Sequence, residues 1–172
     1  MNQKQFKRRP SLAIYPGSFD PITYGHLDIV ARAGRLFDRI IIAVSHASVK
    51  QPMFSVEDRM DLIRESLRES NLNKGIEVDS FQGLLADYAK KKSCFVVIRG
   101  IRFISDFEYE LQMALTNRHL YPDMETVYLM PDEKHIYLSS TIVKEIAGLG
   151  QTPAKFVPRC VARALRSLRA VI

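Results

Sequence analysis

Five short apolar runs alternate with helical patterns along this chain, and this alternation restricts its fold more than any other feature. The runs at residues 39–46 and 94–100 are uninterrupted and rich in β-branched residues, which is typical of strands buried on both faces of a sheet. The pattern predicts an α/β fold, with a Rossmann-like, doubly wound, five-stranded parallel sheet, flanking helices and right-handed crossovers. We expect strands at residues 11–15, 39–46, 76–81, 94–100 and 126–131.

Helical patterns fill the intervals between these runs. Ser55 with Asp58, and Ser105 with Glu108, match the capping box that opens many helices. Pro158 suits the first turn of a last helix, where an N–H would have no intrahelical partner. We expect helices at residues 26–37, 55–70, 84–92, 105–120 and 139–149, and a last one from about residue 158.

The chain has 172 residues, 47% of them hydrophobic, which suits one compact domain with a full core. We expect a single domain over residues 11–172, including the C-terminal helix, after a basic, disordered extension at residues 1–10. Because no apolar run is long enough to span a bilayer and none follows the basic start, we expect neither a membrane span nor a signal peptide. Cys94 and Cys160 lack metal-ligand spacing and fit buried thiols of a cytosolic protein.

The formal net charge of +6 raises the hypothesis of a nucleic-acid partner. Residues 1–10 and 151–172 together carry nine of the 25 Lys and Arg and no acid, so residues 11–150 hold 16 basic against 19 acidic residues. The basicity therefore lies in the two ends. An RNA-binding module that uses these ends stays an open alternative, although no RNP or stacking-aromatic pattern supports it.

Ligands of doubly wound sheets bind beyond the carboxyl ends of the strands. The loops selected by this rule are residues 15–26, 45–53, 82–85, 99–102 and 131–141.

The first of these loops carries the strongest signal. Gly17 lets backbone approach a ligand closely, and Ser18 adds a small hydroxyl. Gly25 and His26 stand where a helix begins, so an anion there would meet free N–H groups and the positive end of the helix dipole. His26 is a candidate donor to a phosphate oxygen whose charge grows during transfer. The alternative is a histidine that only caps the helix.

Arg99 and Arg102 flank Gly100 where a buried strand ends. Neither suits a core without a partner, and two guanidiniums beside a glycine suit two phosphate groups. The alternative is that they pair with Asp106 or Glu108.

Three further candidates carry weaker signals. Lys50 is a point charge for phosphate, Glu110 is an acceptor for a sugar hydroxyl, and the hydroxyls of residues 139–141 at a helix start suit a phosphate cradle. The sequence holds no P-loop, no GxGxxG after the first strand, no GxSxG elbow and no evident metal cluster. A phosphate site without a nucleophile indicates direct transfer, driven by positioning and charge stabilisation.

Together these motifs resemble the bacterial phosphopantetheine adenylyltransferase family, in the nucleotidyltransferase superfamily with the HxGH-type signature. The stretch YPGSFDPITYGH matches the first motif, with the signature as TYGH at residues 23–26. The blocks KQPMF, IRGIRFISDFEYELQMALTNRHL, VYLMP and LSSTIVKE follow in order and spacing. The resemblance covers roughly residues 11–150.

The resemblance implies transfer of AMP from ATP to 4′-phosphopantetheine, giving dephospho-CoA and pyrophosphate. It implies Mg²⁺ held mainly through the ATP phosphates with no protein ligand, a cytoplasmic homohexamer, and no nucleic-acid or membrane partner. His26 would stabilise the transition state. The residues implied for ATP are Ser18, Phe19, His26, Gly100, Ile101, Arg102, Glu110, His135, Ile136, Tyr137, Leu138, Ser139, Ser140 and Thr141. The residues implied for phosphopantetheine are Ser18, Lys50, Leu85 and Arg99.

Three positions depart from the usual family pattern. Ser18 stands where Thr is also usual, Leu85 where Met can occur, and His135 where Trp or Tyr is often found. A related enzyme with another acceptor, such as nicotinate mononucleotide, is the nearest alternative. The block SSTIVKE lacks the additional arginine of that relative's ISTRxxR block, which counts against it.

Overall fold

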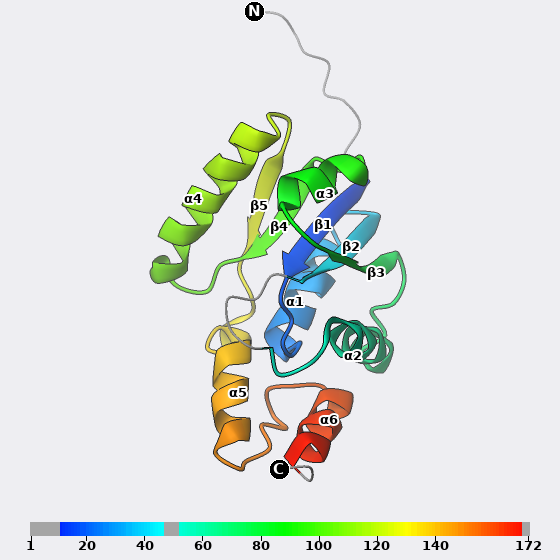
Figure 1. Ribbon diagram of the computed structural model, residues 1–172, viewed down its shortest axis with the longest axis vertical. Coiled ribbons are helices and arrows are strands. Elements are labelled where there is room, and N and C mark those ends of the chain that lie inside the picture. The colour runs from blue at the N-terminus through cyan, green and yellow to red at the C-terminus, as the bar shows by residue number, and fades with distance from the viewer. Residues whose placement is uncertain (1–10, 47–51, 170–172) are drawn as a thin grey trace, which may run out of the picture.

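The computed structural model describes residues 11–46 and 52–169 (Figure 1). Their five strands form one sheet of order β3-β2-β1-β4-β5, and all neighbouring strands are parallel. The predicted Rossmann-like, doubly wound sheet is therefore confirmed. The strands are β1 (Leu12–Gly17), β2 (Arg39–Ser45), β3 (Ile76–Phe81), β4 (Val96–Gly100) and β5 (Glu125–Leu129).

Helices pack against both faces of this sheet (Figure 1). Successive strand residues point to opposite faces, so Ala13 and Tyr15 enter one core cluster and Ile14 enters the other. The larger cluster includes residues of α1, α2, α5 and α6, and the smaller one includes residues of α3. The helices are α1 (Tyr24–Ala33), α2 (Val56–Glu69), α3 (Leu85–Lys91), α4 (Ile104–Leu120), α5 (Ser140–Gly148) and α6 (Arg159–Arg169), with a short 3₁₀ helix η1 (Glu133–His135).

Two helix starts differ from the sequence expectation. α1 begins at Tyr24 because Thr23, not a later residue, is its N-cap. α4 begins at Ile104 without a side-chain cap, so the capping box expected at Ser105 is wrong. The carboxylate of Asp106 instead accepts from the backbone N–H of Arg102 at 3.2 Å, which ties the helix start to the end of β4.

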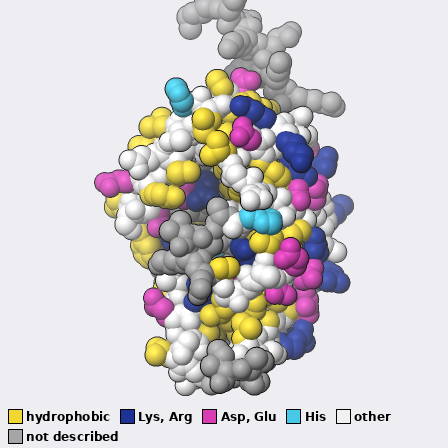
Figure 2. All heavy atoms as spheres, viewed as in Figure 1, with side chains coloured by type: hydrophobic (Ala, Val, Ile, Leu, Met, Phe, Trp, Pro, Cys, Tyr) yellow, Lys and Arg dark blue, Asp and Glu magenta, His cyan; other side chains and the backbone are white. Residues whose placement is uncertain are grey.

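α4 differs from the other helices in the side chains that it exposes. Hydrophobic side chains gather on the part of the surface where this helix lies (Figure 2). The exposed large hydrophobic residues at or within this helix are Phe103, Ile104, Phe107, Tyr109, Leu111, Met113, Leu115 and Leu120. Within residues 11–46 and 52–169, no helix is both long and apolar enough to cross a membrane.

Candidate active site

The order of the strands places the site. The sequence runs outward from β1 in both directions, to β2 and β3 on one side and to β4 and β5 on the other. Loops that follow β1 and β4 therefore diverge, and a crevice forms between them. A cavity of about 290 Å³ opens there. The expected site residues that line it are Ser18, Phe19, His26, Arg99, Gly100, Arg102, Glu110, His135, Leu138, Ser139, Ser140 and Thr141.

The loop after β1 folds back over its own glycine. Phe19 has a positive φ of 47°, and its buried ring lies edge-on to the rings of Tyr15 and His26. A Cβ at Gly17 would lie 2.9 Å from the buried Phe19 ring, so any other residue there would displace this ring. The ring therefore holds the loop beneath the cavity and packs against the histidine.

His26 caps its helix with one ring nitrogen. The backbone N–H of Thr23 donates to Nδ1 of His26 at 3.0 Å, and the N–H of His26 reaches the Thr23 hydroxyl oxygen at 3.4 Å. This is the reciprocal geometry of a capping box, with histidine in place of the usual Glu or Gln. Since a backbone N–H can only donate, Nδ1 must be the acceptor, and a neutral imidazole then carries its proton on Nε2. The capping and functional interpretations of His26 are thus compatible.

The electrostatics of the cavity keep this imidazole neutral. Burial first, then the positive charges of Arg102 and Arg99, lower the pKa of His26 to about 4. At neutral pH the ring is therefore an uncharged Nε2–H donor of fixed tautomer. Burial also raises the pKa of the Tyr15 hydroxyl, which stays protonated beside the same loop.

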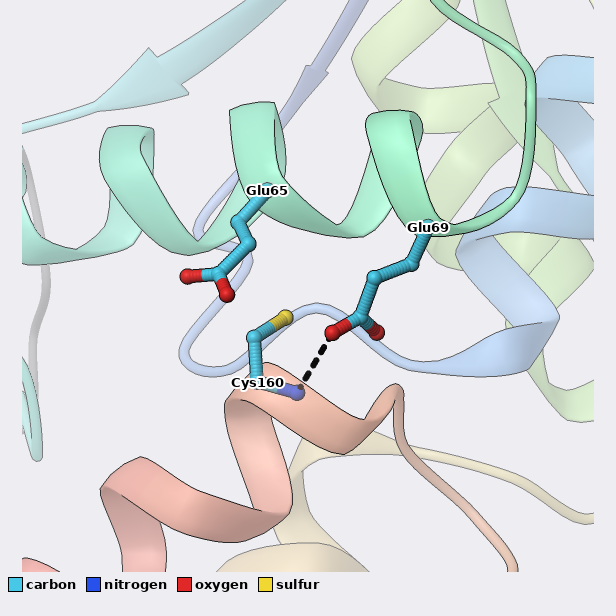
Figure 3. Close-up of side chains that lie close together, drawn as sticks. All are labelled: Glu65, Glu69 and Cys160. Carbon is cyan, nitrogen blue, oxygen red and sulfur yellow. Dashed lines mark hydrogen bonds between the residues drawn. The ribbon is translucent and has the colours of Figure 1, made fainter.

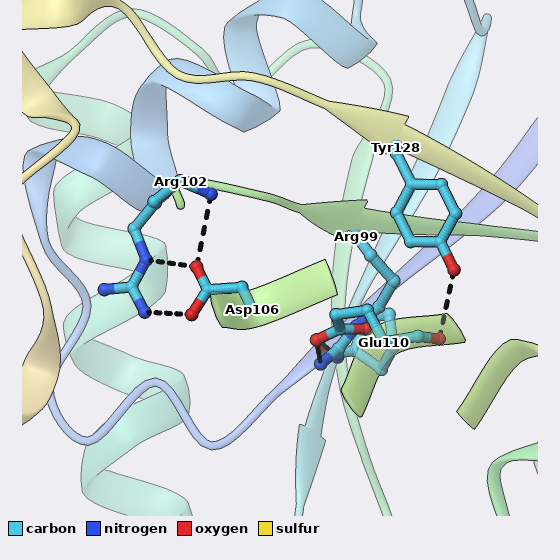
Figure 4. A network of polar contacts seen from close by, with 6 residues as sticks. Arg99, Arg102, Asp106, Glu110 and Tyr128 are labelled. Carbon is cyan, nitrogen blue, oxygen red and sulfur yellow. Dashed lines mark hydrogen bonds and ion pairs between the residues drawn. The ribbon is translucent and has the colours of Figure 1, made fainter. Parts of the chain in front are cut away.

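Arg99 is held by Glu110 and by the first strand (Figure 4). Its Nε donates to Oε2 of Glu110 at 2.7 Å, its Nη2 pairs with Oε1, and its Nη1 donates to the carbonyl of Pro16 at 3.1 Å. The hydroxyl of Tyr128 donates to the Glu110 carbonyl at 3.0 Å. Glu110 is buried, so its alternative interpretation as a solvated helix residue is wrong, and its carboxylate orients the guanidinium in the cavity wall.

Arg102 pairs with Asp106, which was one of the two alternatives for this arginine (Figure 4). Its Nε lies 3.3 Å from Oδ2 of Asp106, and its Nη1 donates to the carbonyl of Leu138 at 3.1 Å. The other alternative partner, Glu108, is exposed. Both arginines nevertheless remain about one-third exposed along the cavity, so their positions are fixed while their charges still face it.

The start of α5 completes the wall. The Ser139 hydroxyl caps this helix by accepting from the N–H of Ile142 at 3.1 Å. The Ser140 hydroxyl donates to the carbonyl of Pro21 at 2.8 Å, which joins the helix start to the loop after β1. The first N–H groups of a helix have no intrahelical partner, so this end of α5 offers donors to an anion.

Asp20 joins three of the converging segments, although the sequence analysis assigned it no role. Its buried carboxylate accepts from the N–H groups of Met53 and Phe54, both at 3.0 Å. It also pairs with Nζ of Lys144 in α5 at 3.0 Å. A single carboxylate thus connects the β1 loop, the start of the segment before α2, and α5.

Some expected residues lie elsewhere. Among the described residues, Leu85, Ile101, Ile136 and Tyr137 are not part of the cavity lining, and Lys50 lies outside the described residues. The cavity also includes residues that the sequence analysis did not name individually as site residues, namely Tyr15, Pro16, Thr23, Ile29, Asp106 and Pro131. The spacing of Thr23 and His26 is the capping-box spacing and could have identified Thr23.

The acidic residues of the cavity do not suggest a metal site. Of the described residues that line it, Asp106 and Glu110 are the acids, and an arginine engages each. Because both acids are engaged by arginines, Mg²⁺ in this cavity would be held through substrate phosphates and water, which is a common mode of binding for this ion.

A second group of metal-ligand types lies where α2 meets α6 (Figure 3). Glu69 accepts from the backbone N–H groups of Arg159 and Cys160 at 3.1 and 3.2 Å, and therefore caps α6. Glu65 pairs with Arg163 at 2.6 Å. Both carboxylates thus have structural roles that join the last helix to α2.

Comparisons with known proteins show the family of this chain. A family model described as cytidylyltransferase-like matches residues 14–146, so the chain belongs to this class of nucleotidyltransferases. A phosphopantetheine adenylyltransferase from Caldanaerobacter subterraneus subsp. tengcongensis is 50% identical over 154 residues, which cover 90% of this chain and 94% of that protein. One from Dictyoglomus thermophilum is 48% identical over 89% of this chain and 92% of that protein. Within its class, the chain belongs to the phosphopantetheine adenylyltransferase family.

A solved structure shares the fold at much lower identity. It is a bifunctional NMN adenylyltransferase/ADP ribose pyrophosphatase from Francisella tularensis, with a TM-score of 0.72 and 14% identity. The match covers 93% of this chain and 50% of that chain. At this identity the likeness concerns the fold and not the acceptor.

The lowered pKa of His26 predicts a pH-dependent stability. Unfolded His26 binds a proton near pH 6.5 and the folded residue only near pH 4, so between these values the unfolded state holds more protons. The free energy of unfolding should therefore fall as the pH drops through this window, by about 2 kcal/mol from pH 7 to pH 5 for this residue. His26→Gln keeps a capping acceptor but cannot titrate. In urea unfolding it should lose this part of the slope, and an unchanged slope would contradict the assignment.

Proposed function

We propose that this chain transfers the adenylyl group of ATP to 4′-phosphopantetheine, giving dephospho-CoA and pyrophosphate. The observation that carries the proposal is the neutral Nε2–H donor of His26, set beside Arg99 and Arg102 in one cavity. Membership of the phosphopantetheine adenylyltransferase family supports the choice of substrates. The reaction is the penultimate step of coenzyme A biosynthesis.

The chemistry needs no nucleophile from the protein. At neutral pH the phosphate of phosphopantetheine is largely ionised, so one of its oxygens attacks the α-phosphorus of ATP directly. The new O–P bond forms as the bond from the α-phosphorus to the bridging oxygen breaks, and pyrophosphate leaves with that electron pair. The enzyme's task is to align two polyanions in line and to reduce their repulsion.

The residues of the cavity divide this task. Nε2–H of His26 donates to a non-bridging oxygen of the α-phosphate, where negative charge grows. Arg99 is proposed to hold the phosphopantetheine phosphate, and Arg102 and the start of α5 to hold the phosphates of ATP. Because Glu110 and Asp106 fix the arginines beforehand, little reorganisation is needed when the substrates arrive.

Mg²⁺ would supply further neutralisation of the phosphate charges, held by phosphate oxygens and water. We also infer a cytoplasmic location, where ATP is available and where Cys94 and Cys160 would stay reduced, since both are free and buried.

The part of the cavity that we assign to adenine has an unusual side chain in its wall. His135 lines the cavity at the position where an aromatic residue is often found in the family, and its ring stacks on Tyr24 at 6.2 Å between centroids. We infer that this stacked pair offers a flat surface for the base.

An acceptor panel tests the proposed function. With ATP and Mg²⁺, 4′-phosphopantetheine should give dephospho-CoA and pyrophosphate, and nicotinate mononucleotide should give no dinucleotide. The measurement is chromatographic separation of the products. No dephospho-CoA, or a preference for the nicotinate acceptor, would refute the proposal.

His26→Ala should separate chemistry from binding. We expect kcat to fall by about 10²–10³-fold, because a donor to the developing charge is lost, while the Kd for ATP changes by less than about threefold. His119→Ala, on the exposed end of α4, is the matched control and should behave like the native protein. An equal loss of turnover and ATP affinity in His26→Ala would contradict the role.

We further propose that the chain forms a homohexamer, as the family resemblance implies, and that α4 lies between copies. Large apolar side chains are exposed along the length of this one helix, and contiguous exposed apolar patches often mark protein–protein interfaces. Leu111→Glu, in the middle of α4, should therefore reduce the assembly to smaller species in analytical ultracentrifugation. Leu149→Glu changes an equally apolar exposed residue outside α4 and should leave the hexamer intact. A native protein that sediments at its chain mass of 19.7 kDa would refute this proposal.

A further inference from the structure

Arg59 is a fully buried cation in the first turn of α2, and the proposed chemistry does not yet use it. Its side chain is among the largest that the core encloses, with 1% of the residue exposed. Nη1 donates to the carbonyl of Ser18 at 2.7 Å and to the carbonyl of Ser45 at 3.2 Å, and Nε donates to the carbonyl of Ser55 at 3.2 Å. Arg59 therefore joins the β1 loop, the end of β2 and the start of α2 from behind the cavity.

No side-chain carboxylate neutralises this guanidinium. None of the ion pairs within residues 11–46 and 52–169 includes Arg59. The remaining segments, residues 1–10, 47–51 and 170–172, contain no Asp or Glu. Among the described residues its partners are three neutral carbonyls, and a buried charge with neutral partners alone is costly.

The other buried charges near this loop are matched. Asp20 pairs with Lys144, and Glu110 pairs with Arg99. Arg59 thus leaves the loop after β1 with one uncompensated positive charge on its buried side. A neutral donor would satisfy the Ser18 carbonyl as well, so hydrogen bonding by itself does not explain why the group is charged.

We propose that Arg59 is a positioning residue for the substrate phosphates. It fixes Ser18 through the Ser18 carbonyl, and its buried charge is compensated when the polyanionic nucleotide enters the cavity that Ser18 lines. Arg59 does not touch the substrate, because its side chain is enclosed on all sides. It acts by positioning the β1 loop and through the electric field of its charge, which the low-dielectric interior screens weakly. The proposal rests on the proposed function, because it takes the nucleotide phosphates as the anion.

Three variants separate charge from packing. Arg59→Gln removes the charge and keeps an amide donor, whereas Arg59→Lys keeps the charge and loses the planar guanidinium. The control is Arg64→Gln, on the same helix, because Arg64 is half exposed and pairs with Asp61. For each, calorimetry without metal gives the Kd for ATP and for inorganic pyrophosphate, and thermal unfolding gives the stability of the free protein. Steady-state assays give kcat and KM.

We expect Arg59→Gln to weaken ATP and pyrophosphate binding by about tenfold or more, whereas Arg59→Lys stays within about threefold of the native protein. Both should lower kcat, because neither holds the Ser18 and Ser45 carbonyls together. Arg64→Gln should match the native protein. Equal losses of anion affinity in Arg59→Gln and Arg59→Lys, or native affinity in Arg59→Gln, would overturn the proposal.

If Arg59→Gln does not fold, Arg59→Lys decides the matter alone. Its anion affinity should stay within about threefold of the native value, and a tenfold loss in a folded Arg59→Lys protein would overturn the proposal. The acceptor panel with the native protein distinguishes a failure of the proposed function from a failure of the role proposed for Arg59. Absence of dephospho-CoA there refutes the proposed function. Normal product formation there, together with native anion affinity in Arg59→Gln or a tenfold loss of affinity in Arg59→Lys, refutes only the role of Arg59.

Discussion

The reversal of strand order between β1 and β4 is the constraint on which the site depends. Because the chain leaves these neighbouring strands in opposite directions, the loops that follow them separate, and a cavity opens at their carboxyl ends. The loop after β1 brings Ser18 and His26 to this space, and the end of β4 brings Arg99 and Arg102. α5 then closes the crevice through Ser140, which binds the β1 loop.

Within the crevice, fixed geometry and charge act together. The backbone N–H of Thr23 donates to Nδ1 of His26, so the proton lies on Nε2. Burial first, and then the charges of the two arginines, lower the pKa of the ring and keep it uncharged. The same arginines would attract the phosphates of both substrates, and their carboxylate partners fix their orientation without removing them from the cavity wall. A neutral donor among cations suits a reaction in which negative charge moves but no proton is transferred.

Sequence alone predicted the sheet because buried parallel strands read as continuous apolar runs, as in residues 39–46. It also selected His26, Arg99 and Arg102, since each lies at the carboxyl end of a strand or in the segment that follows one. It did not reveal that Arg99 pairs with Glu110, because a side chain eleven residues further along becomes a neighbour only when α4 packs against β5 and β4. The sequence also did not indicate that Arg59 is buried, because a charged residue in the first turn of a helix ordinarily faces solvent.

The protonation state of His26 is the most direct test of this account. Nitrogen-15 chemical shifts of a histidine-labelled protein report the charge and the tautomer of each ring. At neutral pH we expect a neutral His26 with its proton on Nε2, a state that persists until the pH approaches about 4. A protonated imidazolium at neutral pH, or a proton on Nδ1, would contradict it.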